Sequence, residues 1–223
     1  MYVNEKLETL YIHIPKTAGR LINFHLKGKK VNDYEHDSIN DLPDKYNEYY
    51  KFTTIRNPYA WYISLFTYLQ KYSNELSRWV DHLNQFEFFL NNCANPVERV
   101  KVHNHIYELE KPTSQLYDFV RKNKTIDCGW FTVHFIYACF SDWKNLLLNS
   151  SVEYIKNNFK KLVSIDEIVK IEELDKFERV KIDTEKKINC SNHEDYHNYY
   201  NNEQIKMVRK QDSLIFDLFG YKY

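Results

Sequence analysis

The stretch Thr9-Leu-Tyr-Ile-His-Ile-Pro-Lys-Thr-Ala-Gly-Arg-Leu21 decides how this chain is interpreted. Residues 9–14 form a short apolar run that stops at a proline, which is typical of a buried strand. Small residues follow at Ala18 and Gly19, and residues 20–27 favour a helix. The stretch therefore predicts a strand, a tight turn and the beginning of a helix.

A turn of this kind suits an anion. Small side chains let backbone N–H groups approach a ligand, the helix N-terminus contributes partial positive charge, and Lys16 contributes a full one. The loop is not a Walker A sequence, because the GxxxxGK[ST] pattern is absent. We expect a phosphate-binding loop that includes Thr17 and Arg20; an ordinary strand-to-helix turn with a solvated lysine is the alternative.

A second stretch, Phe52-Thr-Thr-Ile-Arg-Asn-Pro-Tyr-Ala-Trp-Tyr-Ile-Ser64, repeats the pattern of strand and helix. Residues 51–55 are β-branched and aromatic, and a proline suits the first turn of a helix over 58–72. Arg56 at the end of the strand offers a bidentate fork for phosphate. Ser64, two turns into the helix, can donate its hydroxyl to the same group. A structural arginine and an ordinary helical serine are the alternative.

The rest of the chain fits an α/β protein. Residues 74–122, 144–161 and 203–218 look helical, and 167–171 read as a strand. Strands that alternate with helices predict a three-layer domain with a central parallel sheet covered on both faces. A length of 223 residues suits a single domain, so we expect one over residues 1–223.

Composition excludes several classes of protein. Lys plus Arg and Asp plus Glu both number 31, so no net basic field favours nucleic acid. There is no signal peptide and no run of about 18 apolar residues, so we expect a cytoplasmic protein without a membrane span. Four scattered cysteines without a CxxC pattern argue against zinc and favour free thiols.

Two motifs in this order resemble one enzyme family. Ile14-Pro-Lys-Thr-Ala-Gly19 resembles the 5′-phosphosulfate loop of sulfotransferases that use 3′-phosphoadenosine 5′-phosphosulfate (PAPS), the family of heparan sulfate 2-O-sulfotransferases and many bacterial carbohydrate sulfotransferases. Arg56 and Ser64 keep the spacing of the family's second signature, which holds the donor's 3′-phosphate. Two departures stand out: Arg20-Leu21 replaces the usual Thr-Ser, and Asn57 replaces the usual Asp.

The resemblance implies a fold, a reaction and a set of ligands. The fold is that of P-loop nucleotide kinases, and the reaction transfers a sulfuryl group from PAPS to a hydroxyl, of a carbohydrate by analogy with the family, leaving adenosine 3′,5′-bisphosphate. No metal is expected. Lys16 is implied as a catalytic residue that stabilises the leaving oxygen. The residues implied in binding the donor are Lys16, Thr17, Ala18, Gly19, Arg20, Arg56, Ser64 and Lys187.

The acceptor hydroxyl must lose a proton as it attacks sulfur, so a nearby base is needed. His36 lies between the two phosphate motifs and resembles the family's histidine general base. Its neighbours Glu35 and Asp37 are the alternatives, as base or as groups that orient the ring. His134 resembles a family histidine near the acceptor, and packing explains it equally well.

Two other functions stay open. A P-loop-like kinase is disfavoured because the Walker A pattern and an obvious Mg²⁺-binding Asp are missing. A catalytically inactive nucleotide-binding module of the same fold is compatible with the departures from the family pattern at Arg20, Leu21 and Tyr137.

Overall fold

The computed structural model divides the chain into two compact units. It describes residues 1–32, 36–72, 86, 89–91, 94, 115–186, 188 and 194–223. The first unit comprises Met1–Arg56, His134–Trp143 and Asn158–Cys190. The second comprises Asn57–Val133, Lys144–Asn157 and Ser191–Tyr223. A single domain over the whole chain stays a prediction.

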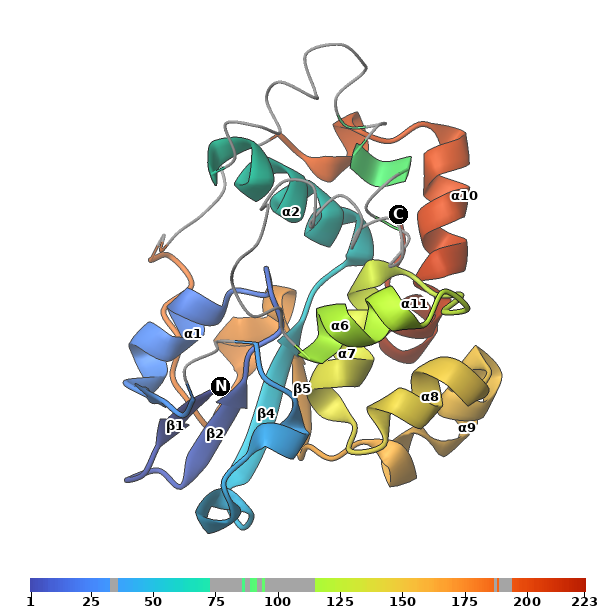
Figure 1. Ribbon diagram of the computed structural model, residues 1–223. Coiled ribbons are helices and arrows are strands. Elements are labelled where there is room, and N and C mark those ends of the chain that lie inside the picture. The colour runs from blue at the N-terminus through green and yellow to red at the C-terminus, as the bar shows by residue number, and fades with distance from the viewer. Residues whose placement is uncertain are drawn as a thin grey trace. The chain divides into compact units, whose positions relative to one another are not determined.

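The first unit is built on a five-stranded sheet with the order β3-β1-β2-β4-β5 (Figure 1). The strands are β1 Tyr2–Asn4, β2 Thr9–Ile12, β3 Lys29–Lys30, β4 Tyr50–Ile55 and β5 Glu167–Lys170. β2, β4 and β5 are parallel, whereas β1 is antiparallel to both β2 and β3. The α/β class is confirmed, but the sheet is mixed. A turn of four residues joins β1 to β2, and so short a connection permits only antiparallel pairing.

Helix α1 (Gly19–Leu26) belongs to the hydrophobic core of this unit. Ile22 and Leu26, spaced one helical turn apart, are fully buried in the same cluster as the strand residues Tyr11 and Phe52. The rings of Tyr11 and Phe52 lie 5.1 Å apart across β2 and β4. This packing holds the beginning of α1 at the end of β2.

Most of the described residues of the second unit lie in helices. Those within it are α2 Pro58–Tyr72, α6 Gln115–Lys122, α10 Asn202–Gln211 and α11 Ser213–Phe219. Those with residues in both units are α7 Trp130–Cys139, α8 Trp143–Asn149 and α9 Val152–Leu162. Short 3₁₀ turns occur at Ile39–Asp41, Asp44–Tyr46, Ile171–Lys176 and Tyr196–Asn198.

Several predicted elements are confirmed. The strands expected at 9–14, 51–55 and 167–171 correspond to β2, β4 and β5, and the helices expected at 20–27 and 58–72 correspond to α1 and α2. The predicted helical region 74–122 lies largely outside the described residues, and α6 is the helix that the structure describes at its end.

Two predicted helices are each broken into two. The helix expected at 144–161 is α8 and α9, because Ser151 caps a new helix by accepting a hydrogen bond from the Tyr154 N–H at 3.1 Å. The helix expected at 203–218 is α10 and α11, separated at Asp212, whose backbone is not helical. Local apolar periodicity continues through both breaks, so the sequence predicted continuous helices.

The backbone of Asp212 is not helical, and its side chain caps α7. One carboxylate oxygen accepts from the Thr132 N–H at 2.8 Å and from its hydroxyl at 2.7 Å, and the other accepts from the Tyr62 hydroxyl at 2.8 Å. Gly129 leaves room for this carboxylate, because an added Cβ would lie 2.3 Å from it. Burial raises the pKa of Asp212 to about 6, although these hydrogen bonds favour the ionised form.

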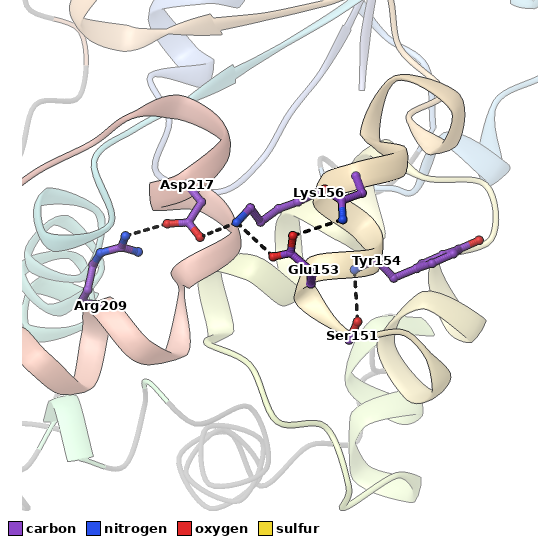
Figure 2. A network of polar contacts seen from close by, with 7 residues as sticks. Ser151, Glu153, Tyr154, Lys156, Arg209 and Asp217 are labelled. Carbon is purple, nitrogen blue, oxygen red and sulfur yellow. Dashed lines mark hydrogen bonds and ion pairs between the residues drawn. The ribbon is translucent and has the colours of Figure 1, made fainter.

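An ion-pair network joins three helices of the second unit (Figure 2). Asp217 of α11 lies between Arg209 of α10, at 2.6 Å, and Lys156 of α9, at 3.0 Å. Lys156 also pairs with Glu153, one turn earlier in α9, at 3.3 Å. Two of the four side chains are largely exposed, so each pair contributes modestly to stability.

Among the residues that the structure describes, no helix is both long and apolar enough to cross a membrane.

Candidate functional site

The two predicted phosphate-binding segments follow neighbouring parallel strands. Ile12 of β2 is the register partner of Thr53 of β4, so the carboxyl ends of both strands meet at one edge of the sheet. The loop with Lys16 follows β2, and Arg56 directly follows β4. Ligands of open α/β sheets bind outside the carboxyl ends of parallel strands. The fold of the first unit therefore brings Lys16 and Arg56 to the same edge.

The loop backbone is strained at two positions. Lys16 and Ala18 both have φ near 63°, in the left-handed region that non-glycine residues rarely adopt. Such conformations persist only where the surroundings hold them, and they occur in backbone concavities that bind anions. Ala18 is also the N-cap of α1 and has no polar side chain to cap the helix. The first N–H groups of α1 therefore receive no hydrogen bond from the side chain of the N-cap residue.

Buried hydroxyl groups hold this loop in place. The Thr17 hydroxyl donates to the carbonyl of Ile14 at 2.8 Å, and the Thr54 hydroxyl donates to the carbonyl of Thr17 at 2.5 Å. The Tyr11 hydroxyl lies 2.7 Å from Thr54 Oγ1. The loop is therefore tied to β4 only two residues before Arg56. The Thr17 hydroxyl already donates a hydrogen bond within the loop. Thr17 would therefore contact a bound phosphate group through its backbone N–H.

Sequence reasoning missed Tyr11 and Thr54. Both are fully buried polar residues within strands; they lie in the two quoted stretches, but the sequence assigned them no role. The available signal was the presence of hydroxyl groups in otherwise apolar strands, since buried hydroxyls are nearly always hydrogen-bonded.

Positive charge is concentrated at the loop. Lys16 is partly buried, and burial together with the charges of Arg56 and Arg20 lowers its pKa to about 8. Arg20, which is expected to bind the donor although it departs from the family pattern, is exposed at the second residue of α1. Cations gathered in this way repel one another, and a bound anion relieves that repulsion.

His36 is exposed and lies beside the end of β2. Its Nδ1 is 3.2 Å from the carbonyl oxygen of His13, and the two imidazole rings are 4.4 Å apart between centroids. A carbonyl oxygen only accepts hydrogen bonds, so Nδ1 carries the proton and the lone pair of the neutral ring is on Nε2. This tautomer is the one that a base acting through Nε2 requires.

The alternative bases differ from His36 in position. Glu35 lies outside the described residues. Asp37 is 7% exposed, and burial raises the pKa of its carboxyl. Burial, and then the charges of Asp41 and Asp37, raise the pKa of the phenol of Tyr137 in α7. The exposed imidazole is therefore more accessible to an acceptor than this carboxylate.

The remaining predicted site residues are placed as follows. Ser64 is buried in the second turn of α2, in the other compact unit, so its action together with Arg56 stays a prediction. His134 is 8% exposed in α7, which leaves little surface for an acceptor to touch. Lys187 lies outside the described residues.

Asn57, which replaces the aspartate of the family pattern, has a structural reason to be an amide. Its Oδ1 accepts from the Tyr59 N–H at 3.0 Å and so caps α2. Its Nδ2 donates to the carbonyl of Lys222 at 2.8 Å and to the Tyr196 hydroxyl at 3.3 Å. An aspartate retains the cap but loses both donated hydrogen bonds.

Within the described part of the chain, no group of three or more His, Cys, Asp or Glu residues is placed to hold a metal ion. Cys128 and Cys139 are free thiols whose pKa burial raises, while Cys93 and Cys190 lie outside the described residues. In comparisons with known proteins, the chain matches no family model, no curated protein and no solved structure. The case for a function therefore rests on its own residues and their geometry.

Proposed function

We propose that this chain is a sulfotransferase that moves the sulfuryl group of PAPS to an acceptor hydroxyl. The observation that supports it best is the meeting of the strained Lys16 loop and Arg56 at the carboxyl ends of parallel strands β2 and β4. The proposal includes the finer fold assignment, a three-layer domain of the P-loop nucleotide-kinase type, and it places the protein in the cytoplasm.

In this proposal the loop binds the 5′-phosphosulfate end of the donor. The backbone N–H groups around Ala18 and Gly19 donate to its oxygens, and Lys16 and Arg20 balance its charge. Arg56 holds the 3′-phosphate with its bidentate guanidinium, assisted by Ser64 and Lys187. The concentration of positive charge at Lys16 supports this assignment, because a bound anion lowers the repulsion between Lys16 and the neighbouring arginines.

His36 is the proposed base. Its Nε2 takes the proton of the acceptor hydroxyl while the acceptor oxygen bonds to sulfur and the bond between sulfur and the phosphate oxygen breaks. Lys16 stabilises the charge that develops on that leaving oxygen, which becomes part of adenosine 3′,5′-bisphosphate. Glu35 and His134 are secondary candidates for contacts with the acceptor. A carbohydrate acceptor is proposed by analogy with the family alone.

Donor binding is the first test, by thermal unfolding with adenosine 3′,5′-bisphosphate in the absence of Mg²⁺. Ligand at one hundred times Kd should stabilise the protein by about 2.7 kcal/mol. ATP with Mg²⁺ is the control for a kinase. Arg56→Lys should weaken binding and Arg56→Ala should weaken it more, by about 2–4 kcal/mol. An unchanged melting temperature at millimolar bisphosphate would remove the donor assignment.

Turnover with labelled PAPS and a panel of carbohydrate acceptors is the second test. His36→Ala should lower kcat by roughly 10²–10⁴ and leave bisphosphate affinity unchanged, because the base faces the acceptor. Binding of the bisphosphate without turnover on any acceptor would instead identify an inactive nucleotide-binding module. Parent-like turnover in His36→Ala would exclude this histidine as the base.

A further inference from the structure

His13 touches the proposed base in two ways. It follows β2 directly, is 6% exposed, and lies among the rings of Tyr2, Tyr11 and His36. Its ring centroid is 4.4 Å from that of His36, and its carbonyl oxygen is the partner of His36 Nδ1. One residue therefore fixes both the tautomer of His36 and the position of its ring.

The same ring lies against the beginning of α1. A Cβ added to Gly19 would lie 1.9 Å from His13 Nε2 and 2.2 Å from Cδ2, far closer than atoms in contact can approach. Gly19 is thus required where it is because the His13 ring occupies the space beside it. This is a different reason from the approach of an anion that the sequence indicated.

The His13 ring is held uncharged and acts through its shape. Burial, followed by the charges of His36, Lys16 and Arg20, lowers its pKa well below 6.5. Its Nδ1 is buried and, among the described residues, has no hydrogen-bond partner. A buried polar atom without a partner adds no stability, so replacing the imidazole by an apolar ring breaks no hydrogen bond of Nδ1.

We propose that His13 is a positioning residue, a rigid spacer whose ring sets the separation between the first residue of α1 and the imidazole of His36. The proposal rests on the proposed function in so far as His36 is the base and the loop binds the donor. His13 itself touches neither substrate; it fixes where the base stands relative to the phosphate loop.

The steric part is tested by a double-mutant cycle on the whole chain, read as the midpoint of urea unfolding. Gly19→Ala should lower the midpoint clearly in the parent and much less in a His13→Ala background, where the ring no longer occupies the space. Equal losses in both backgrounds would overturn the contact. If His13→Ala does not fold, His13→Val removes the ring, introduces a β-branched side chain that suits extended backbone, and carries the same expectation.

The positioning part is tested by the ¹⁵N signals of the His36 imidazole, assigned by their loss in His36→Asn. Every variant keeps the carbonyl of residue 13, so the tautomer changes only if the His36 ring moves away from it. The parent and His13→Phe should both show Nδ1 protonated in the neutral ring, whereas His13→Ala, which lacks the ring that holds His36 in place, should show a mixture of tautomers. In turnover, His13→Ala should lose about 100-fold in kcat, the scale for a misplacement of roughly 1 Å, with bisphosphate affinity unchanged. His13→Phe should restore kcat.

These outcomes separate the two proposals. Suppose that neither the parent nor any variant turns over PAPS, but that the coupling between Gly19 and His13 and the change of His36 tautomer are both observed. The proposed function then fails, and the proposal that His13 is a spacer is supported. A folded His13→Ala protein with the parent's His36 signals would overturn the spacer whatever the activity. A folded His13→Phe protein that resembles His13→Ala would show that the ring nitrogens, and not the shape, are needed, which also overturns it.

Discussion

At the scale of single residues, the candidate site is built from conformations that cost free energy. Lys16 and Ala18 adopt left-handed backbone angles, and neither is a glycine. Each such residue costs roughly 1–2 kcal/mol relative to a right-handed one. Buried hydrogen bonds from Thr17 and Thr54 offset part of that cost and hold the loop in one shape. The loop shape that suits an anion is therefore held by hydrogen bonds of the protein itself.

Replacing Ala18 by glycine tests this strain. Glycine adopts positive φ without steric cost, so Ala18→Gly should raise the free energy of unfolding by about 1 kcal/mol even though the unfolded chain gains freedom. Ala60→Gly is the matched control: it lies within α2 and should lose about 1 kcal/mol. Urea unfolding measures both. A loss in Ala18→Gly similar to the control would mean that residue 18 bears no strain.

At the scale of elements, the sequence predicted what local signals determine. Apolar runs located β2 and β4, and Pro58 located the beginning of α2. The break at Asp212 was missed because its cause, a carboxylate that caps α7, depends on Thr132 about 80 residues away. The same distinction holds for the candidate site. Local motifs indicated Lys16 and Arg56, whereas the role of His13 depends on contacts that only the fold creates.

The Asp212 cap predicts an unusual dependence of stability on pH. The folded protein holds the Asp212 proton with a pKa of about 6, against 3.8 in the unfolded chain, so the folded state binds more protons between these values. This group's contribution is greatest below pH 3.8 and is lost as pH rises through 6, by roughly 3 kcal/mol in total. As the pH is raised from 4 to about 7, the free energy of unfolding of the parent should therefore fall relative to that of Asp212→Asn. A difference that does not change with pH would contradict a raised pKa.

The network around Asp217 predicts a small effect that depends on salt (Figure 2). Burial opposes ionisation of this carboxyl, but hydrogen bonds from Arg209 and Lys156 outweigh it and lower its pKa. Asp217→Asn should cost about 1 kcal/mol at low salt and less at high salt, because the partners are partly exposed. Glu153→Gln is the matched control and should cost less, since it removes one pair and not two. Equal losses at both salt concentrations would assign the effect to packing.

At the scale of the whole molecule, the chain has no net formal charge, with 31 basic and 31 acidic residues. A general positive field therefore does not attract an anionic ligand to it. Attraction has to come from a local concentration of charge, and Lys16, Arg20 and Arg56 supply one at the edge of the sheet. Neutrality overall and positive charge at one site together favour a specific anion site over nonspecific binding to polyanions.

This arrangement predicts that the protein takes up a proton when it binds a phosphorylated ligand. In the free protein, burial and the neighbouring arginines hold the pKa of Lys16 near 8, so at pH 8 about half of the Lys16 side chains are neutral. An anion bound beside Lys16 raises that pKa, and Lys16 takes up as much as about half a proton at pH 8, a contribution that falls toward zero at about pH 6.5. Calorimetric titration of adenosine 3′,5′-bisphosphate in two buffers with different ionisation enthalpies measures the uptake. Lys16→Arg is the control, because a guanidinium stays charged at both pH values and should abolish the uptake. Uptake that persists in Lys16→Arg would assign the proton to another group, and no uptake in the parent would mean that the ligand does not bind beside Lys16.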